Sequence, residues 1–253
     1  SGNYVLNLIG NSTADNTYAA NQANNGAGAF SIVKNGVGTW NLTGSSTYTG
    51  ATLVSQGTLL VNGSLAAGSQ VTVQSGATLG GNGTINGATT IRGLHSPGNS
   101  PGVQTFGGNL SYESGASVLW KLNGNTVSNT PAAYDRIFVG GSLNFQGPTA
   151  LSLAFSGNGS TVSWSDTFWS EDRSWTIYSI TGAGAMSGAQ NLTVSSQNWA
   201  DSQGVLFNDA LAGSSFTLQE SGTSILLNFN VVPEPGTWSL LALAGVVVIA
   251  FRF

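Results

Sequence analysis

The sequence predicts an all-β protein, a parallel β-helix (solenoid) that is followed by a short hydrophobic C-terminal helix. Three observations carry this prediction: an unusual composition, a repeat of about twenty residues, and an uncharged apolar run near the C-terminus. Of the 253 residues, 40% are hydrophobic and only 6% are charged, whereas about 25% are charged in ordinary soluble domains. The surface must therefore be built from Ser, Thr, Asn, Gln and Gly, a composition that favours strands joined by tight turns.

Charge and cysteine content exclude several classes of function. The net charge is −4 and the six basic residues are scattered along the chain, which argues against a nucleic-acid partner. Without cysteine, neither a disulfide nor a thiolate metal site can form, and the single histidine, His95, cannot build a histidine cluster. The sequence predicts no cofactor and no metal.

Residues 1–29 form an Asn- and Ala-rich region with a strand-like run at 4–9 and a polar stretch at 11–28. We predict that it is an N-terminal cap or the first coil of the solenoid. The chain begins at Ser1 without a basic and apolar leader. Removal of a secretory signal gives such a beginning, and so does an arbitrary starting point; we expect the former, and hence an exported protein.

From residue 30 the sequence becomes periodic. Short alternating runs, such as residues 39–43 and 58–61, are separated by Gly, Asn and Ser, which indicates strands with one buried face. Three similar phrases contain Gly57, Gly76 and Gly115, with intervals of 76 − 57 = 19 and 115 − 76 = 39 residues. A period near twenty predicts a solenoid, in which each coil buries its apolar face by stacking on the next.

The same part of the chain resembles a known family. Residues 30–63 resemble an autotransporter-associated β-strand repeat, and residues 75–87 and 96–102 resemble the passenger sequence that follows such repeats. Residues 133–137 and 141–143 continue the resemblance, so that it covers about residues 30–150. It implies a right-handed parallel β-helix outside a bacterial cell, without catalytic residues.

Residues 151–231 keep strand-like runs but lose the regular glycine spacing. We expect either further β-helix with longer insertions or a small separate β-layer. Residues 164–175 are predicted to form an exposed loop that carries Trp164, Trp169 and Trp175. The interpretations of these tryptophans are a platform that stacks on glycans, packing in the core, or side chains that hold the loop together.

The last part, residues 232–253, is predicted to be a hydrophobic tail. Two prolines in Pro233, Glu234 and Pro235 end any strand, and residues 238–251 contain no charge. The motif, the apolar run and Arg252 together resemble a PEP-CTERM sorting signal. This resemblance implies export, membrane insertion and recognition by an exosortase, and it connects the protein with biofilm or extracellular polysaccharide.

The tail is long enough for a thin bilayer. The 18 residues 236–253 form a helix of about 27 Å, against a bilayer core of about 30 Å. A helix without a polar face must lie in lipid or against other copies. The residues expected to insert in a membrane or to mediate assembly are Trp238, Leu240, Leu241, Leu243, Val246, Val247, Val248, Ile249, Phe251 and Arg252.

No catalytic set emerges from the sequence. The ten acidic residues include no pair at strand spacing i, i+2, and only Glu171 and Asp172 are adjacent, whereas a polysaccharide lyase or hydrolase needs clustered carboxylates. His95 precedes a Ser-Pro-Gly sequence and is predicted to be a turn residue, and Asp135 is expected to pair with Arg136. We therefore predict that the protein is not an enzyme.

Taken together, these features predict an exported structural protein of a bacterial cell surface or extracellular matrix. We expect self-assembly into a fibre through stacked solenoids and the apolar C-terminal helix. The alternative is a membrane-anchored adhesin or polysaccharide-binding module of a biofilm matrix, and a polysaccharide-active enzyme is less favoured. The expected partners are other copies of the chain, a membrane or exosortase through the tail, and extracellular polysaccharide.

Overall fold

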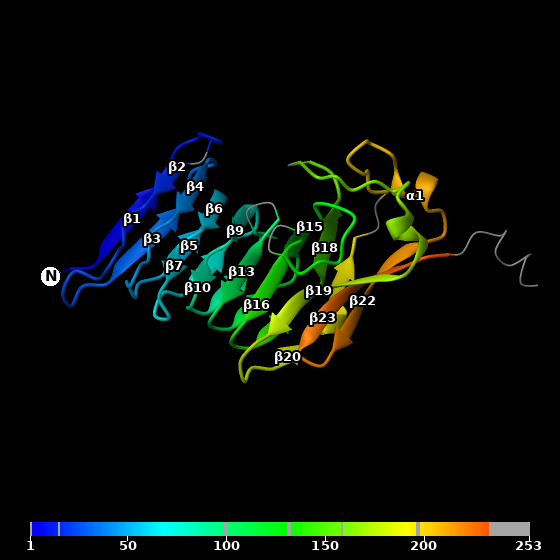
Figure 1. The fold of residues 1–253 in the computed structure, drawn as a ribbon. Coiled ribbons are helices and arrows are strands. Elements are labelled where there is room, and N and C mark those ends of the chain that lie inside the picture. The colour runs from blue at the N-terminus through cyan, green and yellow to red at the C-terminus, as the bar shows by residue number, and fades with distance from the viewer. Residues whose placement is uncertain are drawn as a thin grey trace, which may run out of the picture.

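A computed structural model describes residues 2–14, 16–98, 101–130, 133–157, 159–195 and 198–232. The sorting motif and the hydrophobic helix expected in the tail lie outside the described residues. The described chain is wound into an elongated solenoid with its strands arranged in three sheets (Figure 1). The predicted all-β parallel β-helix is confirmed.

Each sheet takes one strand from successive coils. The first sheet consists of β1 (Tyr4–Leu8), β3 (Phe30–Lys34), β5 (Thr52–Val54), β8 (Val71–Val73), β11 (Thr89–Ile91), β14 (Leu110–Tyr112), β17 (Leu143–Phe145) and β20 (Met186–Ser187). The second consists of β2 (Asn16–Tyr18), β4 (Thr39–Leu42), β6 (Gly57–Val61), β9 (Ala77–Gly81), β12 (Leu94–Pro97), β15 (Ser117–Lys121), β18 (Thr149–Ala154) and β21 (Leu192–Val194). The third consists of β7 (Ser64–Leu65), β10 (Thr84–Ile85), β13 (Val103–Phe106), β16 (Arg136–Val139), β19 (Arg173–Ile180), β23 (Ser224–Asn230) and β22 (Ser215–Ser221).

The coil length agrees with the repeat in the sequence. In the first sheet Ile32 pairs with Thr52, Thr52 with Val71, Val71 with Thr89 and Thr89 with Leu110. These steps are 52 − 32 = 20, 71 − 52 = 19, 89 − 71 = 18 and 110 − 89 = 21 residues. The next two coils are longer because the chain makes excursions between β15 and β16 and between β18 and β19.

The recurring glycines occupy the turns that lead into the second sheet. Gly57, Gly76 and Gly115 have φ values of +64°, +81° and +86°, in the left-handed region where a Cβ atom is costly. Along the strands, buried and half-buried residues alternate, as in β8 and β16. Branched aliphatic and aromatic side chains therefore fill one continuous core along the solenoid.

Residues 151–231 continue the solenoid and then change direction. Strands β19, β20 and β21 pair in parallel with the preceding coil. After α1 (Phe207–Ala210), β22 and β23 form an antiparallel hairpin that pairs with β19. Two short 3-10 helices, η1 (Thr167–Ser170) and η2 (Ala189–Asn191), lie in the connections. Among the described helices, none has the length and apolar character needed to cross a membrane.

Candidate functional surfaces

The three tryptophans proposed for glycan contact are core residues. Trp164, Trp169 and Trp175 are 2%, 1% and 1% exposed. The Trp164 and Trp169 rings lie 4.8 Å apart between centroids and the Trp169 and Trp175 rings 6.0 Å apart, in edge-to-face or tilted orientations. The expected exposure of these three rings is therefore wrong and the interpretation as core packing holds, although residues 165–167 and 170–172 between them are exposed. The rings cannot stack on a sugar from outside. Aromatic rings of this size are buried because water contact with them is unfavourable.

These rings belong to an aromatic cluster that fills the C-terminal part of the core. Two of its indoles are hydrogen-bonded inside the protein: Trp169 Nε1 donates to Asn125 Oδ1 at 3.0 Å, and Trp175 Nε1 donates to the Thr126 carbonyl at 2.8 Å. These hydrogen bonds connect the segment after β15, which contains Asn125 and Thr126, to η1 and β19. The indole nitrogens of Trp164 and Trp199 are buried without a hydrogen-bond partner among the described residues. Its other rings include Trp120, Phe155, Phe168, Trp199, Phe207, Phe216 and Phe229.

His95 is a buried strand residue, and its prediction as a turn residue is wrong. It lies in β12 with its side chain inward, because its neighbours Leu94 and Ser96 face outward. Its Nε2 lies 2.8 Å from Gln104 Oε1 and its Nδ1 lies 2.6 Å from Tyr112 Oη. Because Gln104 Oε1 only accepts, Nε2 carries the proton and Nδ1 accepts from Tyr112.

The His95 cluster has no access to a substrate. Tyr178 donates to Tyr112 Oη at 3.1 Å, and Gln104 Nε2 donates to the Gly80 carbonyl at 3.0 Å, so that a chain of hydrogen bonds runs from Tyr178 to the Gly80 carbonyl inside the core. Burial lowers the pKa of His95 to about 4, which keeps the imidazole neutral. A satisfied, fully enclosed network of this kind specifies one core packing.

Asp135 pairs with Lys121 and not with Arg136. Lys121 Nζ lies 2.7 Å from Asp135 Oδ2, and Asp135 also accepts hydrogen bonds from the backbone amides of Gly102 and Lys121. Consecutive strand residues point to opposite faces. The Arg136 guanidinium accordingly lies over the rings of Tyr134 and Phe138, at 5.7 Å from each centroid.

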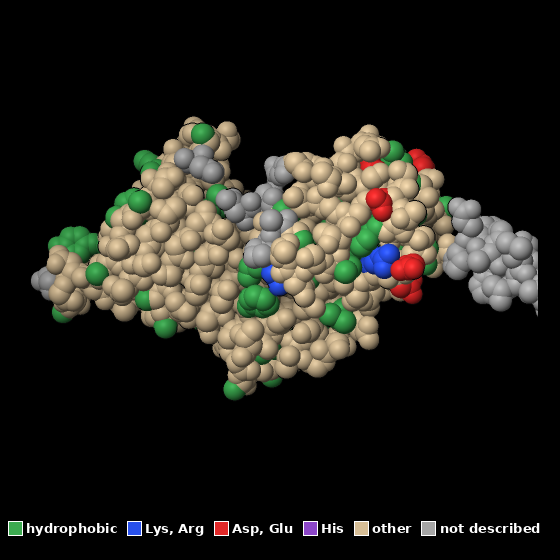
Figure 2. All heavy atoms as spheres, viewed as in Figure 1, with side chains coloured by type: hydrophobic (Ala, Val, Ile, Leu, Met, Phe, Trp, Pro, Cys, Tyr) green, Lys and Arg blue, Asp and Glu red, His purple; other side chains and the backbone are tan. Residues whose placement is uncertain are grey.

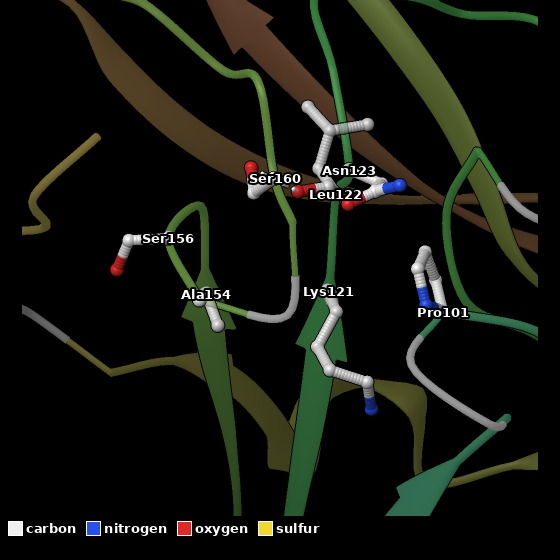
Figure 3. Close-up of a pocket in the computed structure, with 8 residues that line it drawn as sticks. Pro101, Lys121, Leu122, Asn123, Ala154, Ser156 and Ser160 are labelled. Carbon is white, nitrogen blue, oxygen red and sulfur yellow. Dashed lines mark hydrogen bonds between the residues drawn. The ribbon is translucent and has the colours of Figure 1, made fainter. Parts of the chain in front are cut away.

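The ion pair holds strand ends together. Lys121 Nζ donates to Ser96 Oγ at 3.1 Å and to the Pro97 carbonyl at 3.0 Å, so that β12, β15 and the residue before β16 meet at one point. Burial raises the pKa of Asp135 to about 6, against the opposing effect of Lys121. Figure 3 shows the pocket beside Lys121, Ala154 and Ser160. Its volume is about 10 Å³, at the lower limit for one water molecule.

The outer surface is polar and almost uncharged. Figure 2 shows few charged side chains on the visible face, with hydrophobic side chains in small separate groups. Outward residues form rows across the coils, such as Thr39, Thr58 and Thr78 in the second sheet. Asn62 Nδ2 donates to Asn41 Oδ1 at 2.9 Å, and Asn62 Oδ1 accepts from the Asn82 amide at 2.9 Å. Within the described part of the chain, no group of three or more His, Cys, Asp or Glu could hold a metal ion.

Exposed hydrophobic side chains gather at the N-terminal end. Tyr4, Val5 and Ile9 are 49%, 55% and 62% exposed, and Val37 in the second coil is 61% exposed. Strand β1 pairs with β3 on one side only among the described strands. This strand edge is a surface to which another strand could add.

The second open surface is a groove of about 450 Å³ at the other end, which we call the C-terminal groove. It lies between β21, α1 and β22, and no charged side chain lines it. Its lining residues are Val194, Asn198, Trp199, Phe207, Asn208, Ser214, Ser215 and Phe216. No local pattern in the sequence predicts this groove, because its lining residues lie on β21, α1, β22 and the connections between them, which only the fold brings together.

One comparison with known proteins gives a match. Residues 32–61, which run from β3 to the end of β6, match the family model of the passenger-associated-transport-repeat. The chain carries a repeat of autotransporter-like passengers. This repeat, on a β-solenoid, supports an exported passenger-type protein. No curated protein matches the chain. The likeness of the tail to a PEP-CTERM sorting signal stays a prediction.

Proposed function

We propose that the protein is an exported structural component of a bacterial surface or extracellular matrix. The observation that carries this proposal is a β-solenoid that contains a passenger-associated repeat and displays uncharged polar rows on its outside. The polar groups with unusual environments, His95 and Asp135, are enclosed and serve the packing of the coils. A non-enzymatic role is further supported by Glu113 and Glu171, which pair with arginines.

In this proposal the solenoid is the rigid body and the tail is the attachment. The tail directs the chain to a membrane, where an exosortase recognises residues 233–235, and the exposed edge of β1 joins copies to one another. The exposed hydrophobic side chains of Tyr4 and Val5 on β1 and the scarcity of charge support self-assembly into fibres, since few charges keep copies apart. The glycan-binding alternative loses the observation that favoured it, because the three tryptophans are buried.

Electron microscopy of the purified full chain tests the assembly. We expect filaments, and we expect Val5→Lys to abolish them because a lysine on the edge of β1 opposes strand addition. Thr72→Lys, a half-buried outward position in the middle of the first sheet, is the matched control and should leave filaments intact. Monodisperse single particles of the unmodified chain in native buffer would refute self-assembly.

A further inference from the structure

We propose that the apolar C-terminal segment, residues 238–251, docks in the C-terminal groove of its own chain and closes the core there. This interaction goes beyond the proposed structural role. It concerns the state of the tail in water, before lipid or another copy receives it.

The groove lies at the end of the core, where Phe207 and Phe216 are 2% and 8% exposed. In the inner coils, each layer of inward side chains is covered by the layers of the neighbouring coils. The first and second sheets end at β20 and β21 in the described chain, and no described strand follows there. The aromatic rings of Trp199, Phe207 and Phe216 line the resulting groove. Terminal coils of solenoids need a cap because their apolar face has no neighbour.

The chain itself leads to this groove. Val231 packs against the core, and its amide donates to Asp172 Oδ1 at 2.9 Å. The next amide, of Val232, donates to Ser214 Oγ at 3.2 Å, and Ser214 lines the groove. The position of the chain at residue 232 is therefore fixed at the rim of the groove.

The connection between Val232 and the apolar segment is short. Residues 233–237 separate Val232 from the apolar segment, and five residues span at most about 18 Å when fully extended. A short connection of this kind gives an effective concentration of about millimolar at a neighbouring site. The apolar segment is thus delivered to the groove without the entropy cost of bringing two molecules together.

The chemistry of the two surfaces matches. Residues 238–251 contain no charge and, as a helix, have no polar face, so exposure to water is unfavourable. The groove has aromatic side chains and no charged lining, while Asn198, Asn208 and Ser215 can bind backbone groups at its margin. The other candidate occupants are the apolar first coil of a second copy and an external polysaccharide, neither of which is held beside the groove by the chain.

Disulfide trapping in the full chain tests the docking, and the absence of native cysteine makes the result unambiguous. The test variant carries Ser215→Cys in the groove and Ala244→Cys in the apolar segment. The control variant carries Ser221→Cys at the other, exposed end of β22 together with Ala244→Cys. Under mild oxidation we expect the test variant to form a disulfide within one chain at least ten times faster than the control, at a rate independent of protein concentration.

Two outcomes would overturn the proposal. Equal rates for the two variants would mean that the tail samples both sites freely and that the groove is open to an external ligand. A disulfide that forms only between two chains, seen as twice the chain mass, would mean that a second copy covers the groove.

Adding Leu243→Asp and Val247→Asp to the test variant should slow the reaction at least fivefold. Filament formation is scored separately by microscopy, so failure of the docking and failure of the proposed function are distinguishable.

Discussion

Burial decides how much a charged residue and its partner contribute to the free energy of unfolding. The side chains of Lys121 and Asp135 are 14% and 1% exposed, whereas those of Arg92 and Glu113 are 40% and 34% exposed. Both pairs have short N–O distances, 2.7 Å in each case. A buried carboxylate that loses its partner is much more costly than an exposed one, because water cannot replace the lost interaction.

The first prediction compares these two pairs. Lys121→Met should lower the free energy of unfolding by about 3–5 kcal/mol at pH 7, since the buried Asp135 loses its partner and must either stay charged or take up a proton. Arg92→Met should lower it by less than about 1 kcal/mol. Chemical denaturation of both variants measures the difference. Equal losses would show that the Asp135 pair is not a structural clamp.

A second prediction concerns pH. The pKa of Asp135 rises from 3.8 to about 6 on folding, mainly because of burial, so the folded chain binds more protons between these values. The Asp135 contribution to the free energy of unfolding should therefore fall by about 3 kcal/mol as pH rises from about 4 to about 6. His95 acts in the opposite direction, because burial lowers its pKa from 6.5 to about 4, and its contribution is lost as pH falls through that range.

Denaturation at several pH values separates the two contributions. Relative to the unmodified chain, Asp135→Asn should become steadily less destabilising between pH 4 and pH 6. His95→Gln should become steadily more destabilising over the same range. Two difference curves that stay flat with pH would contradict the assignment of both groups.

At the scale of secondary-structure elements, three turns into the second sheet, those at β6, β9 and β15, each contain one glycine in the left-handed conformation. Gly57 and Gly76 have similar positive φ values but different surroundings. A Cβ atom at Gly57 would collide with the carbonyl oxygens of Gly36 and Gly38, while a Cβ atom at Gly76 would meet nothing within 4 Å. Similar sequences around Gly57 and Gly76 therefore form one tightly packed turn and one open turn.

The third prediction uses this contrast. Gly76→Ala should lower the free energy of unfolding by about 1–2 kcal/mol, the cost of a left-handed conformation alone. Gly57→Ala should cost clearly more, because backbone atoms of the preceding coil must also move. Thermal and chemical unfolding measure both values. A smaller loss for Gly57→Ala would show that this turn relaxes easily.

On the scale of the whole molecule, the two ends of the solenoid differ. Among residues 2–29, Leu8 is the only buried hydrophobic residue that the structure describes. The C-terminal part instead contains the aromatic cluster around Trp164, Trp169 and Trp175. In a solenoid each coil contacts only its neighbours, so local stability follows local packing.

Hydrogen exchange provides the fourth prediction. Amides of β1 should exchange at least about 100-fold faster than those of β16 and β19 in the isolated chain, because few buried contacts hold the first coil. In assembled filaments the difference should shrink, since the proposed contact covers the edge of β1. Equal protection of both ends in a monomeric sample would contradict the packing gradient.

The sequence by itself determined the regular coils from residue 32 to residue 110. Gly57, Gly76 and Gly115 mark left-handed turns, and the period near twenty equals the spacing of the coils, because one coil is a local unit whose length is set by the chain between turns. The alternation of apolar and polar residues determined which faces are buried for the same reason. Both signals are local, and neither depends on contacts with distant parts of the chain.

Only the tertiary structure decided the roles of His95, Asp135 and the three tryptophans. The partners of His95 lie 9 and 17 residues away in the chain, and the Trp169–Asn125 hydrogen bond joins residues 44 apart. Stacking of coils brings such residues together across turns whose lengths no local pattern predicts. The C-terminal groove has the same origin: it exists because the coils end there, while the sequence continues into an apolar segment.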